Sequence, residues 1–251
     1  MSGHSKWSSI KHKKAALDAK RGKAWSKLAR AITLTARDGG GDPGANPSLR
    51  LAIEKAKAAN MPKDTIEKAI KKGTGGVEGE AYEEVVYEGY GPAGVAVLCS
   101  VVTDNRNRTA PEVKRILERC GGNLGAPNCV AWMFSQKGVF AISAEEVDED
   151  KVLQVALENG AEDVMSSRIV HEVICEPNAF HDLKAAFEAA NIPIQSADVT
   201  KFASNQITLD LDNARKVLKL MDVLEEHDDV NNVSSNFDIP DDVMAELSAG
   251  Q

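Results

Sequence analysis

The sequence predicts a multidomain α+β protein, in which a basic N-terminal domain of three helices precedes two split-βαβ domains. Apolar residues recur at helical spacing in the first third of the chain, whereas short strands and helices alternate in the rest. The charge also changes sign between these parts. Residues 1–76 contain 17 basic and 6 acidic residues, a net charge of +11, so in a chain of net charge −8 the remaining 175 residues carry −19.

Three helices are expected before residue 76. The first runs from Asp18 to Arg37, and the glycines at 39–41 end its pattern. Asn46 is the expected N-cap of the second helix, and Gly73 is the expected C′ residue of the third. The apolar stripes of the first two helices consist of Trp25, Leu28, Ala29, Ile32 and Ala36, and of Leu49, Ala52, Ile53 and Ala56.

Strands and helices alternate after residue 80. A GPAG turn joins the expected strands 82–90 and 95–103, and a capping box of Thr109 and Glu112 precedes the next helix. Further strands are expected at 130–134, 138–142, 169–175, 196–202, 206–211 and 230–237, and further helices at 148–159, 177–191 and 213–226. The segment 95–237 thus reads as four βαβ units, enough for two split-βαβ (ferredoxin-like) domains. These domains could follow in series, or the middle two units could be inserted between the outer two. The hydrophobic periodicity is the same for both arrangements and does not distinguish them.

Composition excludes several classes of protein. No apolar run approaches the ~18 residues of a membrane span, and the N-terminal lysines precede no apolar segment of a signal peptide. The four cysteines lie far apart, without a CxxC pair or a histidine at ligand spacing, which predicts buried thiols, no metal site and a cytoplasmic location. The segment DGGGDPGANPS lacks the GxxxxGK[ST] pattern of a phosphate-binding loop, so we expect no cofactor and no small-molecule substrate.

The first helix carries its cations on one face. Within an arc of about 80° opposite the apolar stripe lie Lys20, Lys23, Lys27, Arg30 and Arg37. Leu34 interrupts this face, and Arg21 falls on the apolar side near the start of the helix. Upstream, a Gly- and Ser-containing arm adds Lys6, Trp7, Lys11, Lys13 and Lys14.

These cations predict a surface that contacts nucleic-acid phosphates. Cations that neutralise phosphates release condensed counterions, and an aromatic side chain in the arm could stack on an exposed base. The plain alternative is a solvated helix face, but such faces usually alternate in sign, whereas this one is basic in a chain that is otherwise acidic. The acidic remainder would be repelled by a polyanion and would orient docking, or would serve solubility alone.

Several stretches resemble the YebC/PmpR family, which includes the mitochondrial translational activator of cytochrome c oxidase. They are SGHSKWSSIKHKKAALDAKRGKAWSKLAR, GGGDPGANPSLRLAIEKAKAANMPKDTIEKAIKKGTGG, YEGYGPAGVAVL, TDNRNRT and, near the end, LEEHDDVNNVSSN. The resemblance implies the nested arrangement, with a third domain inserted into the second. We therefore expect a helical nucleic-acid-binding domain at 1–78, a discontinuous α+β domain at 79–136 and 204–240, an inserted domain at 137–203 and a C-terminal tail at 241–251.

The resemblance also implies a role in gene expression. Members of the family are described as DNA-binding transcriptional regulators, and others as ribosome-associated factors that help translation through proline-rich stretches. Carried onto this chain, the basic N-terminal positions would contact duplex DNA or ribosomal RNA. Family usage favours the first partner, whereas an arm containing Trp7 suits irregular RNA better.

No catalytic constellation is evident in the sequence. No nucleophile and base stand at a spacing that would pair them, so a non-enzyme is predicted.

Arg106 and Arg108 stand at a polar strand-to-helix junction, where they could bind an anion or pair with local acids. A third hypothesis is an adaptor whose acidic domains bind a basic protein.

Overall fold

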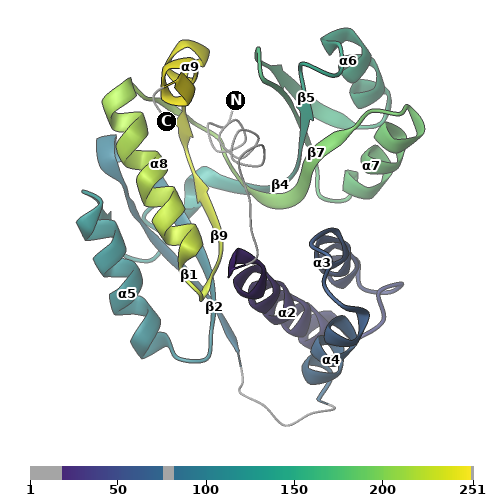
Figure 1. The fold of residues 1–251 in the computed structure, drawn as a ribbon, viewed down its shortest axis with the longest axis vertical. Helices are drawn as coiled ribbons and strands as arrows, with labels where there is room; N and C mark the ends of the chain where they lie inside the picture. The colour runs from purple at the N-terminus through teal and green to yellow at the C-terminus, as the bar shows by residue number, and fades with distance from the viewer. Residues whose placement is uncertain (1–18, 76–81, 250–251) are drawn as a thin grey trace.

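The N-terminal domain is a cluster of three helices in a computed structural model that describes residues 19–75 and 82–249 (Figure 1). The helices are α2 (Ala19–Gly39), α3 (Pro47–Ala58) and α4 (Lys63–Gly73). Their apolar stripes pack into one core, with the residues predicted for α2 and α3 buried or partly buried in it. Asn46 caps α3 as predicted, because its side-chain oxygen accepts a hydrogen bond from the Leu49 amide at 3.0 Å.

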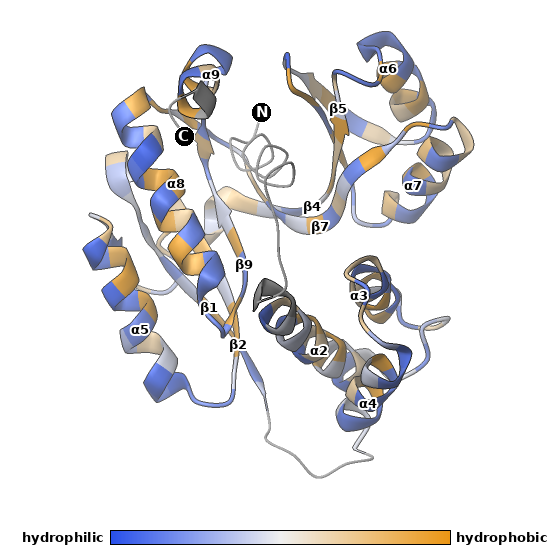
Figure 2. Ribbon diagram, in the orientation of Figure 1, coloured by the Kyte–Doolittle hydropathy of each residue, from blue (hydrophilic) through white to orange (hydrophobic). Residues whose placement is uncertain are grey.

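The second domain is built on a four-stranded antiparallel sheet with the order β3-β1-β2-β9. Its strands are β1 (Glu83–Tyr90), β2 (Ala96–Thr103), β3 (Asn123–Leu124) and β9 (Val230–Ser235). Helices α5 (Arg106–Arg119) and α8 (Leu211–Glu226) cover one face of this sheet (Figure 1). In Figure 2, α8 carries both hydrophilic and hydrophobic residues along its length, and its apolar residues, among them Leu220 and Leu224, join the core of the domain.

The third domain is inserted between β3 and α8 of the second. Its sheet has the order β5-β6-β4-β7, with strands β4 (Phe134–Ser143), β5 (Ala161–Ser166), β6 (Val170–Cys175) and β7 (Ile194–Ala203). Helices α6 (Glu149–Glu158) and α7 (Phe180–Ala189) connect these strands as two split-βαβ units. Phe140 on β4 stacks on Phe180 at the start of α7, with ring centroids 4.8 Å apart. The predicted α+β class and the nested order are confirmed, because β1, β2 and β9 share one sheet although the whole third domain lies between them in sequence.

Three local predictions are corrected. Residues 130–134 do not form a strand: Ala131–Met133 is a 3-10 turn, η2, and β4 begins at Phe134. The buried Glu88 carboxylate accepts hydrogen bonds from the amides of Asn128, Val130 and Ala131 at 2.6–2.9 Å, and so draws this segment out of the extended conformation. Although burial alone would raise the pKa of Glu88, these three donors lower it.

The other two corrections concern helix ends. Helix α5 begins at Arg106 and is capped by Asn105, whose side chain accepts from the Arg108 amide at 3.2 Å, so Thr109 and Glu112 are not its capping box. Gly73 is the last residue of α4, and Gly75 takes the left-handed conformation at φ +80°. A Cβ on Gly73 would lie 2.3 Å from the Thr33 carbonyl oxygen, so close packing of α4 on α2 explains this glycine.

The C-terminal segment packs on the second domain. Helix α9 (Asp241–Ala249) lies within the residues for which a tail is expected, and it places Met244 and Leu247 in the domain core. A short parallel pair, β8 (Ile207–Thr208) with β10 (Phe237–Asp238), precedes it. The residue-level domain boundaries given above remain a proposal. None of the helices in residues 19–75 and 82–249 combines the length and apolar character needed to cross a membrane.

Candidate nucleic-acid interface

The structure describes four of the predicted cations of the first helix. Lys23, Lys27, Arg30 and Arg37 all belong to α2. The arm residues Lys6, Trp7, Lys11, Lys13 and Lys14 lie outside the described residues, and the side chains of Lys20 and Arg21 are not described either.

The basic face of α2 lies against an acidic turn of the second domain, which we define as residues 225–229 (Figure 1). Lys23 Nζ is 2.9 Å from Asp228 Oδ1, and Lys27 Nζ donates to the Glu225 carbonyl oxygen at 2.5 Å. Arg30 Nη1 donates to the Asp228 carbonyl oxygen at 2.9 Å and to Asp229 Oδ1 at 3.0 Å. The expected row of cations in solvent is therefore corrected for these three residues, because ion pairs and carbonyl oxygens of the same chain partly cover them.

Asp229 is the centre of this interface. Its side chain is only 4% exposed, and its Oδ2 accepts from Arg108 and from the Thr109 hydroxyl, both at 2.7 Å, and from Thr103 at 3.2 Å. Burial alone would raise the pKa of Asp229, but the hydrogen bonds from Arg108 and Thr109 outweigh it and hold the pKa below its usual range. Asp229 thus stays ionised between the two arginines Arg30 and Arg108.

The position of Lys27 on α2 disfavours the charged form of its side chain. Its burial, together with the neighbouring Lys23 cation, lowers the pKa of its ammonium group. On the same helix face, Leu34 is 6% exposed, although it lies outside the apolar core of the helical domain. The basic face of α2 is therefore partly desolvated in this arrangement.

A cavity of about 640 Å³ opens at the same place. The cations Lys23, Arg30, Arg108 and Arg115 line it, together with Ile116, His227 and the carboxylates of Glu112, Asp228 and Asp229. His227 bridges two of these groups, since its Nε2 lies 3.0 Å from Glu112 Oε2 and its Nδ1 accepts from the Asp229 amide at 3.1 Å. A neutral imidazole with its proton on Nε2 satisfies both contacts.

A second interface joins the helical domain to the inserted domain. Lys55 on α3 pairs with Asp198 on β7 at 2.5 Å, and Glu54 pairs with Lys184 on α7 at 2.6 Å. Leu51, earlier on the same helix, packs against the core of the inserted domain. The helical domain therefore contacts both α+β domains through charged pairs.

Comparison with known proteins accounts for both parts of the chain. Residues 5–76 match the model of the TACO1/YebC protein N-terminal domain, and residues 82–237 match that of the TACO1/YebC second and third domain. The chain belongs to the TACO1/YebC family.

Relatives resemble this TACO1/YebC chain over nearly its whole length. A probable transcriptional regulatory protein of Geobacter sulfurreducens is 54% identical over 98% of this chain and all of its own length. A protein of the same description from Dictyoglomus turgidum is 54% identical over 99% of this chain and all of its own. The crystal structure of a conserved hypothetical protein from Aquifex aeolicus superposes with a TM-score of 0.80, at 48% identity over 89% of this chain and 93% of that one.

Three further predicted cations of this TACO1/YebC protein, Arg37, Arg106 and Arg108, also have acidic or carbonyl partners. Arg37 donates to Asp38 Oδ1 at 2.8 Å and to the Tyr82 carbonyl oxygen at 2.6 Å. Arg108 pairs with Asp104 as well as with Asp229, and Arg106 lies 3.6 Å from a Glu83 oxygen. In this arrangement Arg106 and Arg108 therefore pair with nearby acids, which is one of the two alternatives stated above; the other is the binding of an anion.

The sequence-based prediction omitted the acidic residues of this interface and a second set of cations elsewhere in the helical domain. Asp228 and Asp229 come from a segment about 200 residues away from α2, and their only sequence signal is the acidic run LEEHDD, together with the interruption of the basic face by Leu34. A second set of cations in the helical domain is exposed, and none of them lies on α2: Lys57, Lys63, Lys68 and Lys71.

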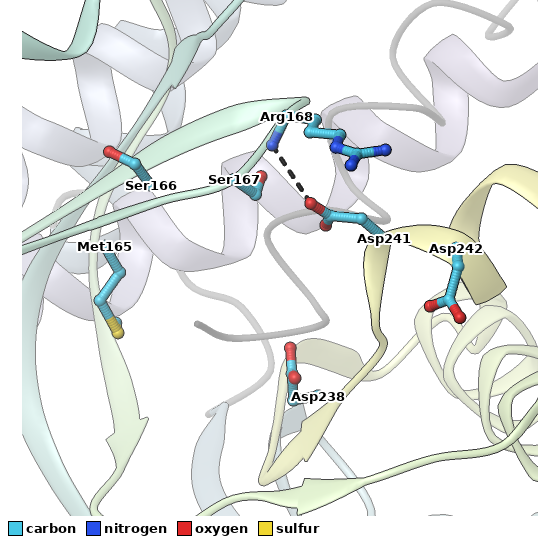
Figure 3. Close-up of a pocket in the computed structure, with 7 residues that line it drawn as sticks. All are labelled: Met165, Ser166, Ser167, Arg168, Asp238, Asp241 and Asp242. Carbon is cyan, nitrogen blue, oxygen red and sulfur yellow. Dashed lines mark hydrogen bonds between the residues drawn. The ribbon is translucent and has the colours of Figure 1, made fainter.

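A second cavity, of about 630 Å³, lies between the β5–β6 hairpin and the start of α9 (Figure 3). Its walls carry Arg168 and three aspartates, and Asp241 accepts a hydrogen bond from the Arg168 amide at 3.2 Å.

Among the described residues, no group of three or more His, Cys, Asp or Glu side chains is placed to hold a metal ion. Burial raises the pKa of the Cys99 thiol to about 12 and that of Cys175 to about 11, so both thiols are protonated at neutral pH.

Proposed function

We propose that this protein regulates transcription by binding DNA through the basic face of its N-terminal helical domain. Relatives that are 54% identical over almost the whole chain are named probable transcriptional regulatory proteins. The observation that carries the proposal is the row of Lys23, Lys27 and Arg30 on one face of α2, in a segment of net charge +11 within an acidic chain.

The spacing of this row suits a phosphodiester backbone. The three cations are four and three residues apart, so they follow successive turns of α2 and extend over about 10 Å of its length. Lys and Arg at such positions neutralise phosphates, and the released counterions supply affinity that does not depend on base sequence. The acidic α+β domains would be repelled by the same polyanion, which directs it to the helical domain.

The alternative partner is RNA, including the RNA of the ribosome. Phosphate contacts position a protein on either polymer but do not read the bases. The arm with Trp7 favours this alternative, since an indole ring stacks on unpaired bases more readily than on the closed stack of a duplex. In that case the protein would act in translation.

Fluorescence anisotropy with two labelled probes tests the proposal. The full-length protein is titrated against a 20-base-pair duplex DNA and a single-stranded RNA of equal length, between 50 and 200 mM salt. With about four phosphate contacts, from Lys20 together with Lys23, Lys27 and Arg30, log K should fall with log[salt] at a slope of about −3.6 for the duplex and about −2.8 for the RNA. Tighter binding of the duplex supports transcription, tighter binding of RNA supports the alternative, and the absence of binding to both at 50 mM salt refutes the proposal.

A further inference from the structure

The cations that the proposed function assigns to phosphates already have an occupant. Lys23, Lys27 and Arg30 each place a nitrogen within 3.0 Å of an oxygen from the acidic turn. We propose that the acidic turn occupies the nucleic-acid face of α2 as an internal competitor, so that a phosphodiester polyanion binds this face only after α2 has moved away from the turn. This inference rests on the proposed function and adds a regulatory step to it.

The acidic turn offers the same chemistry as a phosphate backbone. The Asp228 and Asp229 carboxylates and the carbonyl oxygens of Glu225 and Asp228 accept hydrogen bonds from the three cations. Phosphate oxygens would take the same donors, and two sets of anionic acceptors cannot occupy one face together. The exposed charge of Asp228 would in addition repel an approaching phosphate.

Two of the contacts that close this interface, those of Lys23 and Lys27, are of a kind that a polyanion can displace. In the Lys23–Asp228 pair the side chains are 43% and 68% exposed, and exposed pairs contribute little stability and are screened by salt. Lys27 is partly buried with a carbonyl oxygen as its acceptor, and that burial lowers the pKa of its ammonium group. Closure therefore has a desolvation cost at Lys27 that opening removes.

The acidic turn keeps its shape without α2. When Arg30 leaves, Asp229 retains its hydrogen bonds with Arg108, Thr103 and Thr109, all of which belong to the second domain. His227 likewise retains Glu112 on α5. The turn is thus held in position by its own domain, ready to bind α2 again when the nucleic acid dissociates.

A zero-length cross-link measures whether the interface is closed. Carbodiimide activates the Asp228 carboxylate, the Lys23 amine attacks it, and an amide forms with release of the urea; the 2.9 Å separation allows this only in the closed arrangement. The yield of this cross-link is measured by peptide mass spectrometry, without probe and with saturating duplex DNA or single-stranded RNA. We expect the nucleic acid to lower it at least about fivefold.

An internal control and a matched pair of variants complete the test. The cross-link of Lys137 to Glu162, within the inserted domain, should keep its yield. Asp228→Asn should bind the probe about three- to tenfold more tightly at 50 mM salt than Asp212→Asn, which removes an equal charge from an 83% exposed side chain at the start of α8.

Failure of this inference can be told from failure of the proposed function. If the wild type binds the probe while the Lys23–Asp228 cross-link persists and the two variants bind equally, the acidic turn does not compete, although the protein does bind nucleic acid. If the wild type binds neither probe at 50 mM salt, the proposed function is refuted and this inference with it.

Discussion

Asp229→Asn should destabilise the second domain and loosen its contact with α2. The carboxylate is 4% exposed and accepts from two guanidinium groups and two threonine hydroxyls. Hydrogen bonds to charged groups contribute about 1.5–3 kcal/mol each. The asparagine keeps one acceptor oxygen, and Arg108 keeps Asp104 at 2.8 Å, so we expect a net loss of about 2–3 kcal/mol in the free energy of unfolding.

Urea denaturation at several pH values measures this loss, with Asp212→Asn as the exposed control. Because the folded-state pKa of Asp229 is lowered, its contribution is complete above the unfolded pKa of about 3.9 and is lost as the pH falls through the folded pKa. The difference between wild type and Asp229→Asn should therefore be largest near pH 7 and shrink below about pH 4. A loss under 1 kcal/mol at pH 7, or a difference that does not depend on pH, would refute the assignment of Asp229 as the centre of the interface.

Three further predictions concern the rest of the chain. Glu88→Gln places an amide donor against backbone N–H donors, so it should lower the free energy of unfolding by about 1–3 kcal/mol in urea denaturation. An unchanged denaturation midpoint would contradict the role of Glu88 in shaping η2. Gly73→Ala should cost about 1–3 kcal/mol in thermal unfolding, since its Cβ would meet the Thr33 carbonyl at 2.3 Å; a neutral effect would mean that α2 and α4 can separate without cost. Trp7→Ala should weaken binding to single-stranded RNA by about 1–3 kcal/mol in anisotropy titrations, and binding to duplex DNA much less. Equal losses of affinity for both probes, with a lower melting temperature, would show that Trp7 packs on the protein.

Features set by residues near in sequence could be predicted. The apolar stripes of α2 and α3 follow from helical periodicity, and the Asn46 cap follows from the preference of Asn for that position. The alternation of strands and helices gave the α+β class. The nested order needed the family resemblance, because both arrangements of the βαβ units have the same periodicity.

Features set by distant residues could not be predicted. The segment 130–134 has the composition of a strand, but Glu88, more than 40 residues earlier, fixes it as a turn through three backbone amides. Similarly, helical geometry correctly placed Lys23, Lys27 and Arg30 on one face, but it could not show that residues 225–229 cover that face. Leu34, an apolar residue among cations, was the one local sign that this face is not wholly in solvent.

The central claim, that the basic face of α2 binds the phosphodiester backbone, is tested most directly by comparing two charge-reversal variants. One carries Lys20→Glu, Lys23→Glu, Lys27→Glu and Arg30→Glu on α2. The other makes the same change in charge within the same domain, at the exposed lysines Lys57, Lys63, Lys68 and Lys71. Far-UV circular dichroism first establishes that both retain their helices, as expected because none of the described side chains that are changed belongs to the apolar core.

The measurement is the affinity of each variant for the duplex and the RNA probe at 50 mM salt. The α2 variant should lose at least about 100-fold in affinity and most of the salt dependence, because about four phosphate contacts disappear. The lysine control should lose much less, since only the general field of the domain changes. Equal losses in the two variants would show that net charge alone attracts nucleic acid, and wild-type affinity in the α2 variant would show that this face does not bind it.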